Sequence, residues 1–229
     1  TGEVSKAAEG INPMREAEML PSPRLLTSHL SYDVMPESVR QGICKVVVVL
    51  RNPKSLFNST FQYEMLLPEE FQEVQTFDEY LDSQLTEVQD KITFGTWLNH
   101  VSGWWRNREK MKGNIHFIHY EDMIQDMSKV VADLAKFLNK NLSQEAINTA
   151  TEYLQYGNMK TNPKTGNAFE NVTVYPDTDT NRQQMFQASH MRKGAIDDWK
   201  NNLTVAQSER IDEYLYPRLE KIDLKFQYE

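Results

Sequence analysis

The chain has 229 residues, of which 39% are hydrophobic and 25% are charged, and its formal net charge is −8. This is the composition of an ordinary globular protein, and a chain of this length can bury a stable hydrophobic core without disulfides or structural metal ions. The acidic charge argues against a nucleic-acid partner, the single cysteine excludes an internal disulfide and a Cys-rich metal site, and no apolar run is long enough to span a membrane. We therefore expect a cytoplasmic protein with no metal and no membrane partner.

The first half of the chain predicts strands and helices in alternation. Residues 24–29 favour a short strand, and residues 36–42 suit a short helix or turn. The run Lys45–Leu50 is continuous and β-branched, which is typical of a parallel strand buried on both faces. Pro53 suits the first turn of a helix, so we expect a helix from about residue 53 to residue 66.

The second half continues the alternation. It predicts a strand over Ile115–Tyr120 and helices over residues 75–91, 93–112, 127–139 and 143–156. Ser143 is expected to cap the last of these helices. The order of elements predicts a single α/β domain over residues 1–229, doubly wound, with a central parallel sheet flanked by helices.

Two further segments have distinct patterns. Residues 157–190 fit no periodic template, and so long a stretch without structure is usually functional or disordered. Residues 199–214 favour a loop followed by a helix. The spacing of Trp97, Trp104 and Trp105 is typical of core packing.

Arg51 follows the valine-rich strand directly, at the edge where open α/β sheets bind ligands. The helix expected from Pro53 would point its free N–H groups and positive dipole end toward the same region. Ser55 and Ser59 lie four residues apart, hence on one face of that helix. These features predict a phosphate pocket, because an arginine fork matches a phosphate. The alternative is that Arg51 pairs with an acidic neighbour and Ser59 faces solvent.

Two other groups of residues suit chemistry at the same edge. Arg192, Lys193 and Gly194 close the irregular stretch and could lay charge and backbone against a phosphate, although most such triplets are solvated surface. His29 ends the first predicted strand. Imidazole is the side chain best suited to remove a hydroxyl proton near neutral pH, although a histidine at a strand end is often structural.

In their joint order, these segments resemble the cytosolic sulfotransferases over roughly residues 20–229. Those enzymes have a P-loop-like α/β fold and use 3′-phosphoadenosine 5′-phosphosulfate as donor, with 3′-phosphoadenosine 5′-phosphate as product. The resemblance implies that His29 is the catalytic base, although Thr27 and Ser31 stand where the family usually has Lys and Pro. It assigns the 3′-phosphate to Arg51, Ser59, Arg192, Lys193 and Gly194, and it adds Met191 to the residues that bind the cofactor.

The resemblance also assigns the adenine and acceptor sides. Tyr120 would contact the adenine, and Tyr156 and Met159 would sandwich it; the alternative is that both tyrosines are ordinary, partly buried residues. Tyr63 and His100 are candidates for the pocket of a small-molecule acceptor that bears a hydroxyl or amine.

The chain carries the family's dimerisation pattern, Lys-x-x-x-Thr-Val-x-x-x-Glu. Its fixed positions are Lys200, Thr204, Val205 and Glu209. A self-complementary patch with Lys at one end and Glu at the other suits a two-fold homodimer. Thr204 could also cap a helix, and both roles are compatible.

One family motif, a strand followed by a Lys- and Gly-containing loop that cradles the 5′-phosphosulfate, has no counterpart in residues 1–20. Because that strand would lie centrally in the sheet, we expect residues upstream of Thr1 in the full polypeptide. Two functions stay open. One is a sulfotransferase that acts on a small-molecule hydroxyl or amine, and the other is a catalytically silent nucleotide-binding or interaction protein of the same fold.

Overall fold

The computed structural model describes residues 17–87, 95–165, 173–175, 178–188 and 191–228. The chain divides into two compact units, Thr1–Leu30 and Ser31–Glu229, and each is described by itself. Residues 24–29 of the first unit form no strand, so that prediction is wrong. A strand needs a neighbouring strand to bond its backbone groups, whereas the N–H of Leu30 bonds locally to the Ser28 hydroxyl at 3.1 Å.

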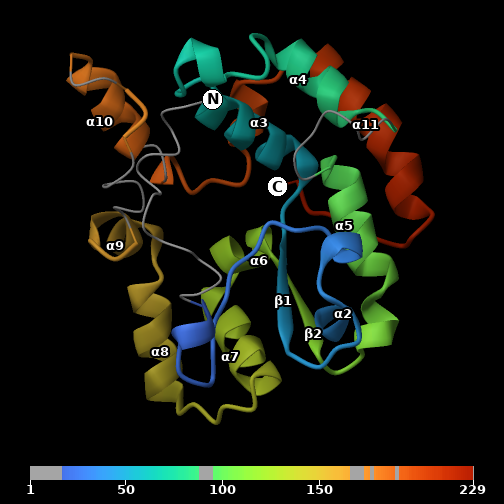
Figure 1. Cartoon of the computed structure of the whole chain (residues 1–229), viewed down its shortest axis with the longest axis vertical. Coiled ribbons are helices and arrows are strands. Elements are labelled where there is room, and N and C mark those ends of the chain that lie inside the picture. The colour runs from blue at the N-terminus through green and yellow to red at the C-terminus, as the bar shows by residue number, and fades with distance from the viewer. Residues whose placement is uncertain (1–16, 88–94, 166–172, 176–177, 189–190, 229) are drawn as a thin grey trace. The chain divides into compact units, whose positions relative to one another are not determined.

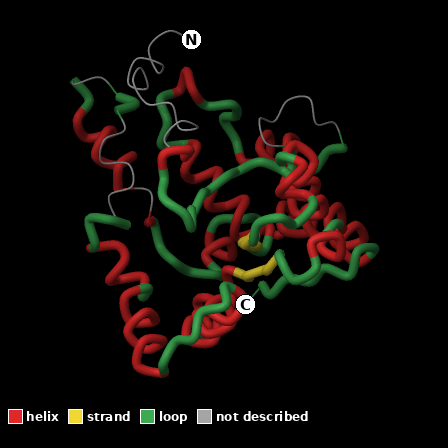
Figure 2. The backbone as a smooth tube through the Cα atoms, turned by 60° about the horizontal axis from the view of Figure 1, so that its bottom comes forward, coloured by secondary structure: helices red, strands yellow, loops and turns green. Residues whose placement is uncertain are grey.

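The second unit contains a parallel pair of strands, β1 (Val46–Leu50) and β2 (Ile115–His119). Val46 lies opposite Ile115 and Leu50 opposite His119. Figure 1 shows the strands side by side, and Figure 2 shows helices around them. The strands predicted over Lys45–Leu50 and Ile115–Tyr120 are confirmed, and so is the α/β class with a parallel sheet.

Helices connect and flank the two strands. In chain order they are α2 (Glu37–Arg40), α3 (Pro53–Glu64), α4 (Phe77–Gln84), α5 (Trp97–Arg106), α6 (Tyr120–Gln125), α7 (Met127–Phe137), α8 (Gln144–Tyr153), α9 (Tyr156–Thr161), α10 (Thr180–Ala188) and α11 (Val205–Glu220). Short 3-10 turns are η1 (Tyr32–Val34), η2 (Glu69–Phe71), η3 (Arg108–Met111) and η5 (Asp198–Asn201). The helices expected over 53–66, 75–91, 93–112, 127–139 and 143–156 correspond to α3, α4, α5, α7 and α8, while residues 88–94 lie outside the described part.

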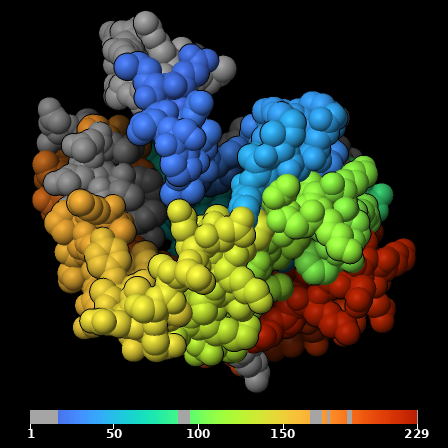
Figure 3. All heavy atoms as spheres, turned by 90° about the horizontal axis from the view of Figure 1, so that it is seen from below, coloured from blue at the N-terminus to red at the C-terminus, as the bar shows by residue number. Residues whose placement is uncertain are grey.

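The two faces of β1 differ in how far their side chains are buried. Val48 and Leu50 are 7% and 1% exposed, whereas Val47 and Val49 are 39% and 58% exposed. The expectation that both faces are buried is therefore wrong, because alternate side chains of a strand point to opposite faces and only one of them joins the core. On the opposite face α7 covers β2, where the Phe137 ring stacks on His116 at 5.1 Å. Figure 3 shows α7 beside α8.

An aromatic cluster fills the core on the buried face of the sheet. Phe57 and Trp104 are 0% and 3% exposed, and the Phe57 and Trp97 rings meet edge to face at 6.1 Å. Trp105 is partly buried and donates its indole N–H to the Ile222 carbonyl at 2.9 Å. The prediction that the three tryptophans belong to the core is confirmed.

Side-chain caps begin several helices, which otherwise leave their first N–H groups without partners. The Asn52 side chain accepts from the Ser55 N–H at 2.8 Å and starts α3 directly after β1. Ser143 accepts from the Ala146 N–H at 3.2 Å, as predicted. Thr204 forms a capping box with Gln207, so its capping role is confirmed.

Residues 157–190 are not wholly irregular, which corrects the expectation for this stretch. Helix α9 begins at Tyr156, and α10 follows Asp179. The Asp179 carboxylate accepts from the Arg182 N–H at 3.2 Å and lies 3.6 Å from its guanidinium. The cap and the ion pair of Asp179 begin a helix that is too polar to show a periodic pattern of apolar residues. In the sequence, this helix was therefore signalled by its capping residue Asp179 and not by periodicity.

Lys54 ties the C-terminal part of the chain to α3. Its side chain is nearly buried, and its ammonium donates to Ser208 at 2.8 Å and to Asp212 at 2.6 Å. The same ammonium lies 4.8 Å from the centroid of the Trp199 ring. Because a buried ammonium must keep its partners, these contacts hold η5 and α11 against the helix that follows β1.

Candidate anion-binding site

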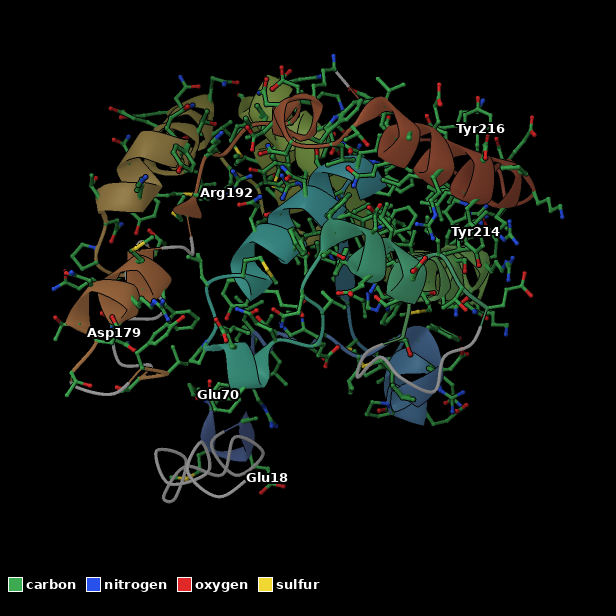
Figure 4. The ribbon with its side chains drawn as sticks, turned by 90° about the horizontal axis from the view of Figure 1, so that it is seen from above. Glu18, Glu70, Asp179, Arg192, Tyr214 and Tyr216 are labelled. Carbon is green, nitrogen blue, oxygen red and sulfur yellow. The ribbon has the colours of Figure 1, made fainter. Side chains whose placement is uncertain are left out.

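Segment Met191–Asp198 lies along the first turns of α3. Arg51 and Ser55 donate to the backbone carbonyls of Ala195 and Ile196 at 3.4 and 2.5 Å. The two donors are four residues apart and share a face of the helix and its entry turn. Figure 4 shows Arg192 on this segment, beside α3. The fold thus brings the Arg-Lys-Gly run to the carboxyl end of β1, where the sequence predicted it.

Glu121 joins the carboxyl ends of the two strands. It is fully buried, and its Oε1 accepts from the Asn52 backbone N–H at 3.0 Å and from the Asn52 side-chain amide at 2.9 Å. The joint holds the residues that flank it, Arg51 and Tyr120, next to each other. Glu121 was not among the predicted site residues; its position directly after the predicted strand Ile115–Tyr120 was the available signal.

Arg51 stacks on Tyr120, with its guanidinium carbon 4.5 Å from the ring centroid. Burial lowers the pKa of Arg51 and raises the pKa of Tyr120 from their ordinary values. The guanidinium stays charged in this setting, because its pKa starts far above neutrality. No ion pair within the described residues includes Arg51, so the acidic-neighbour alternative is not what this part of the chain adopts.

Two guanidinium N–H groups at this place are buried without a partner. The Nε atoms of Arg51 and Arg192 have no hydrogen bond among the described residues, and the two charges act on each other. Buried polar groups are hydrogen-bonded in most folded proteins, so two unpaired cationic donors indicate a site for an anion.

The buried carboxylate of Asp198 pairs with both cations of the Arg-Lys-Gly run, Arg192 and Lys193. Asp198 is 6% exposed, and its oxygens lie 2.7 Å from Arg192 Nη2 and 2.6 Å from Lys193 Nζ. Burial by itself would raise the pKa of Asp198, but the hydrogen bonds and charges of Lys193 and Arg192 outweigh it and lower the pKa to about 2. The carboxylate is therefore ionised at neutral pH.

Gly194 meets the ring of Tyr156. Its φ is +67°, and a Cβ built there would lie 2.3 Å from Tyr156 Cδ2. The Tyr156 hydroxyl donates to the Met191 carbonyl at 2.8 Å. Only glycine combines this backbone conformation with so close a neighbour. Helix α9 thereby shapes the Arg-Lys-Gly turn.

The structure gathers most residues predicted to hold the nucleotide. Arg51, Tyr120, Tyr156 and the run Met191–Gly194 lie together at the carboxyl ends of the strands, and Ser59 is half-buried one turn beyond Ser55 on α3. Met159 is half-buried on α9, three residues after Tyr156. The specific nucleotide contacts of these residues stay predictions.

His29 belongs to the unit Thr1–Leu30, where its side chain is exposed, so its role as a base stays a prediction. The acceptor residues also stay predictions. Tyr63 packs against Phe186 of α10 at 5.8 Å, and burial raises the pKa of its phenol. His100 is half-buried on α5.

The four residues of the dimerisation pattern lie at the surface of the chain. Val205 is 74% exposed at the first position of α11. Lys200, Thr204 and Glu209 are exposed as well. An exposed valine between exposed polar residues leaves the predicted dimer interface accessible, and the dimer stays a prediction.

Comparison with known proteins assigns the family. The model of the sulfotransferase domain matches residues 6–223. The chain belongs to the sulfotransferase family. It is 30% identical over 216 residues to sulfotransferase 1C2 of Homo sapiens, covering 93% of this chain and 67% of that protein. It is 32% identical over 216 residues to sulfotransferase 1B1 of Canis lupus familiaris, covering 94% and 68%.

Solved structures share the fold of this sulfotransferase. Mouse sulfotransferase SULT7A1, complexed with PAP, is 25% identical with a TM-score of 0.73 over 91% of this chain and 70% of its own. Retinol dehydratase, in complex with androsterone and PAP, gives a TM-score of 0.75 at 22% identity over 93% and 58%. The chain thus spans about two thirds of the length of the curated relatives named above. Across its described residues, no helix has the length and apolar character to cross a membrane.

Gly194→Ala is expected to destabilise this sulfotransferase. The positive φ alone costs about 1–2 kcal/mol for a non-glycine residue, and the added methyl would displace the Tyr156 ring. The measurement is the free energy of unfolding in denaturant. In a Tyr156→Ala background the clash disappears, and only the backbone cost should remain.

Gly157→Ala is the matched control for this prediction. A Cβ at Gly157 meets nothing within 4 Å, and the residue lies in α9. Alanine is favoured over glycine in helices by roughly 1 kcal/mol, so this variant should be neutral or more stable. Equal losses in the two variants would contradict the role given to the Tyr156 contact.

Proposed function

We propose that this sulfotransferase moves a sulfuryl group from 3′-phosphoadenosine 5′-phosphosulfate to a hydroxyl or amine of a small-molecule acceptor. The observation that carries the proposal is the pair of buried, unpartnered Nε–H groups on Arg51 and Arg192. A relative of the same fold, mouse SULT7A1, is complexed with PAP, which supports the choice of nucleotide. The name of rabbit amine sulfotransferase, 30% identical over 211 residues, supports the acceptor class.

The chemistry of these side chains fits the 3′-phosphate of such a nucleotide. Arg51, Arg192 and Lys193 carry three positive charges, against which the structure sets the Asp198 carboxylate. A phosphate near the Arg51 and Arg192 guanidinium groups would accept from the two free Nε–H groups, and charge-assisted bonds of this kind are strong. Ser59 would add a hydroxyl donor, and Gly194 lets the backbone approach closely.

Aromatic side chains beside the cations suit the base of the nucleotide. Tyr156 is held in place by the hydrogen bond from its hydroxyl to the Met191 carbonyl and by the close approach of Gly194 to its ring. Stacking on an aromatic ring is worth about 1–3 kcal/mol for a base, whatever its identity. Tyr156 and Met159 would hold the adenine, with Tyr120 at its edge.

We assign the proton transfer to His29. When bound, the donor nucleotide would supply the sulfuryl group. The chain's own task is then to take the proton from the acceptor hydroxyl as that oxygen attacks, and a neutral imidazole does this near neutral pH. Thr27 supplies no positive charge near His29, where the family usually has Lys, so the rate would depend on cations elsewhere. The competing function is a silent nucleotide-binding protein of this fold, which would bind the nucleotide without turnover.

The nucleotide assignment predicts a selective thermal shift. 3′-Phosphoadenosine 5′-phosphate should raise the Tm of the full-length protein well above the rise given by AMP, because a ligand that binds only the folded state stabilises it. Arg51→Ala should remove most of that difference. Arg108→Ala is the matched control, since Arg108 also lies over an aromatic ring, Trp105 at 4.4 Å, but on η3. Equal shifts from both nucleotides in the wild type would refute the assignment.

The base assignment predicts a loss of turnover without a loss of nucleotide binding. In the full-length protein, His29→Ala should lower turnover by about a hundredfold or more, as expected when a general base is removed. The shift in Tm given by 3′-phosphoadenosine 5′-phosphate should stay as in the wild type. Thr27→Lys should raise the rate if a missing cation limits it. Unchanged turnover in His29→Ala would remove His29 from the mechanism, and binding without any turnover in the wild type would favour the silent protein.

We further propose that the protein is a cytoplasmic homodimer formed through Lys200, Thr204, Val205 and Glu209. Val205→Glu should give a folded monomer in sedimentation velocity at about micromolar concentration, because the interface would then bury an unpaired charge. Val34→Glu is the matched control, since Val34 is 62% exposed in η1 and should leave the dimer intact. A monomeric wild type would remove the dimer and leave the enzymatic proposal untouched.

A further inference from the structure

Asp198 is anchored from two sides in addition to its ion pairs. The side-chain amide of Asn58, on α3, lies 3.4 Å from its Oδ2, and the Asn202 amide donates to the same oxygen at 3.3 Å. Asn202 also donates to the Asp198 backbone carbonyl at 2.7 Å. The carboxylate is therefore tied to the helix that follows β1 and to the turn that precedes α11.

We propose that Asp198 is a positioning residue of the anion site, holding the side chains of Arg192 and Lys193 where they receive the 3′-phosphate of the nucleotide. This inference rests on the proposed function and adds a residue to it. A chain of polar contacts connects α3 with the cations. Asn58 on α3 is hydrogen-bonded to Asp198, and Asp198 forms ion pairs with Arg192 and Lys193. Arg51 precedes the N-terminus of the same helix.

Arg192 and Lys193 need a positioning residue because their side chains are partly exposed to solvent. The Lys193 side chain is 52% exposed and that of Arg192 is 29% exposed. Long cationic side chains lose much rotamer freedom when they are ordered, so without a fixed counter-ion they would have to be ordered by the ligand itself. A buried, ionised carboxylate that Asn58 and Asn202 hold in place orders them before the ligand arrives, which is the usual effect of preorganisation on affinity.

The opposite role for Asp198 is a competing anion. A carboxylate that already neutralises Arg192 and Lys193 would oppose a phosphate, and its removal would then tighten binding. Two features favour positioning. The carboxylate is buried among protein donors, and the Nε–H of Arg192 is left without a partner although its Nη2 contacts Asp198. Asp198 therefore holds the Arg192 guanidinium at Nη2 and leaves its Nε–H available to the phosphate.

Asp198→Asn separates the two roles, because it keeps the shape of the side chain and removes its charge. Titration calorimetry on the full-length protein would compare 3′-phosphoadenosine 5′-phosphate with AMP. We expect the affinity for the first to fall about tenfold or more, as for the loss of hydrogen bonds to charged groups, and the affinity for AMP to change little. Asp197→Asn is the matched control, because this exposed neighbour forms no ion pair with Arg192 or Lys193 in the described part of the chain, and it should bind both nucleotides as the wild type does.

Asn202→Ala covers the case in which Asp198→Asn does not fold. Asn202 is exposed, so its replacement should leave the fold intact while it loosens the Asp198 carboxylate. A smaller loss, selective for 3′-phosphoadenosine 5′-phosphate, is expected. Unchanged or tighter binding in these variants, or equal losses for both nucleotides, would overturn the inference. A wild type that does not prefer 3′-phosphoadenosine 5′-phosphate over AMP would instead refute the proposed function.

Discussion

The fully buried carboxylate of Glu121 accepts two hydrogen bonds from Asn52 at the point where β1 becomes α3. Because β1 and β2 run parallel with Leu50 opposite His119, the residues that follow them emerge at one edge of the sheet. Glu121 locks that edge, so Arg51 and Tyr120 stack and α3 leaves the sheet in a fixed direction. The remaining cations of the site are then positioned relative to α3, and loss of this joint would leave a buried amide without its partner.

The second constraint is the docking of Met191–Asp198 on α3. It brings Arg192 and Lys193 to Arg51 across more than a hundred residues of chain, through bonds from Arg51 and Ser55 to backbone carbonyls and through the Asp198 carboxylate. The protein as a whole is acidic, with a net charge of −8, yet the place where these side chains meet is cationic. Local geometry therefore decides the sign of the ligand, and the net charge decides only which large partners are disfavoured.

The two ends of the Arg-Lys-Gly run are controlled by different kinds of contact. At Gly194 a backbone with φ of +67° fits beneath the Tyr156 ring, which is a steric requirement. At Arg192 and Lys193 the Asp198 carboxylate acts by charge. A substitution at Gly194 should therefore change stability first, whereas a substitution at Asp198 should change anion affinity first.

The sequence by itself determined the elements and residue types that depend on near neighbours along the chain. These are both strands, the helices α3, α5, α7 and α8, the caps at Ser143 and Thr204, and the cations Arg51, Arg192 and Lys193. Other features required the tertiary structure. Residues 24–29 form no strand in their unit, and β1 buries only one of its faces. Both outcomes depend on which elements pack against a segment, and strand propensity carries no such information. The Asp198 ion pairs and the Glu121 joint were decided in the same way, because the folded backbone sets the geometry that brings each carboxylate to its partners.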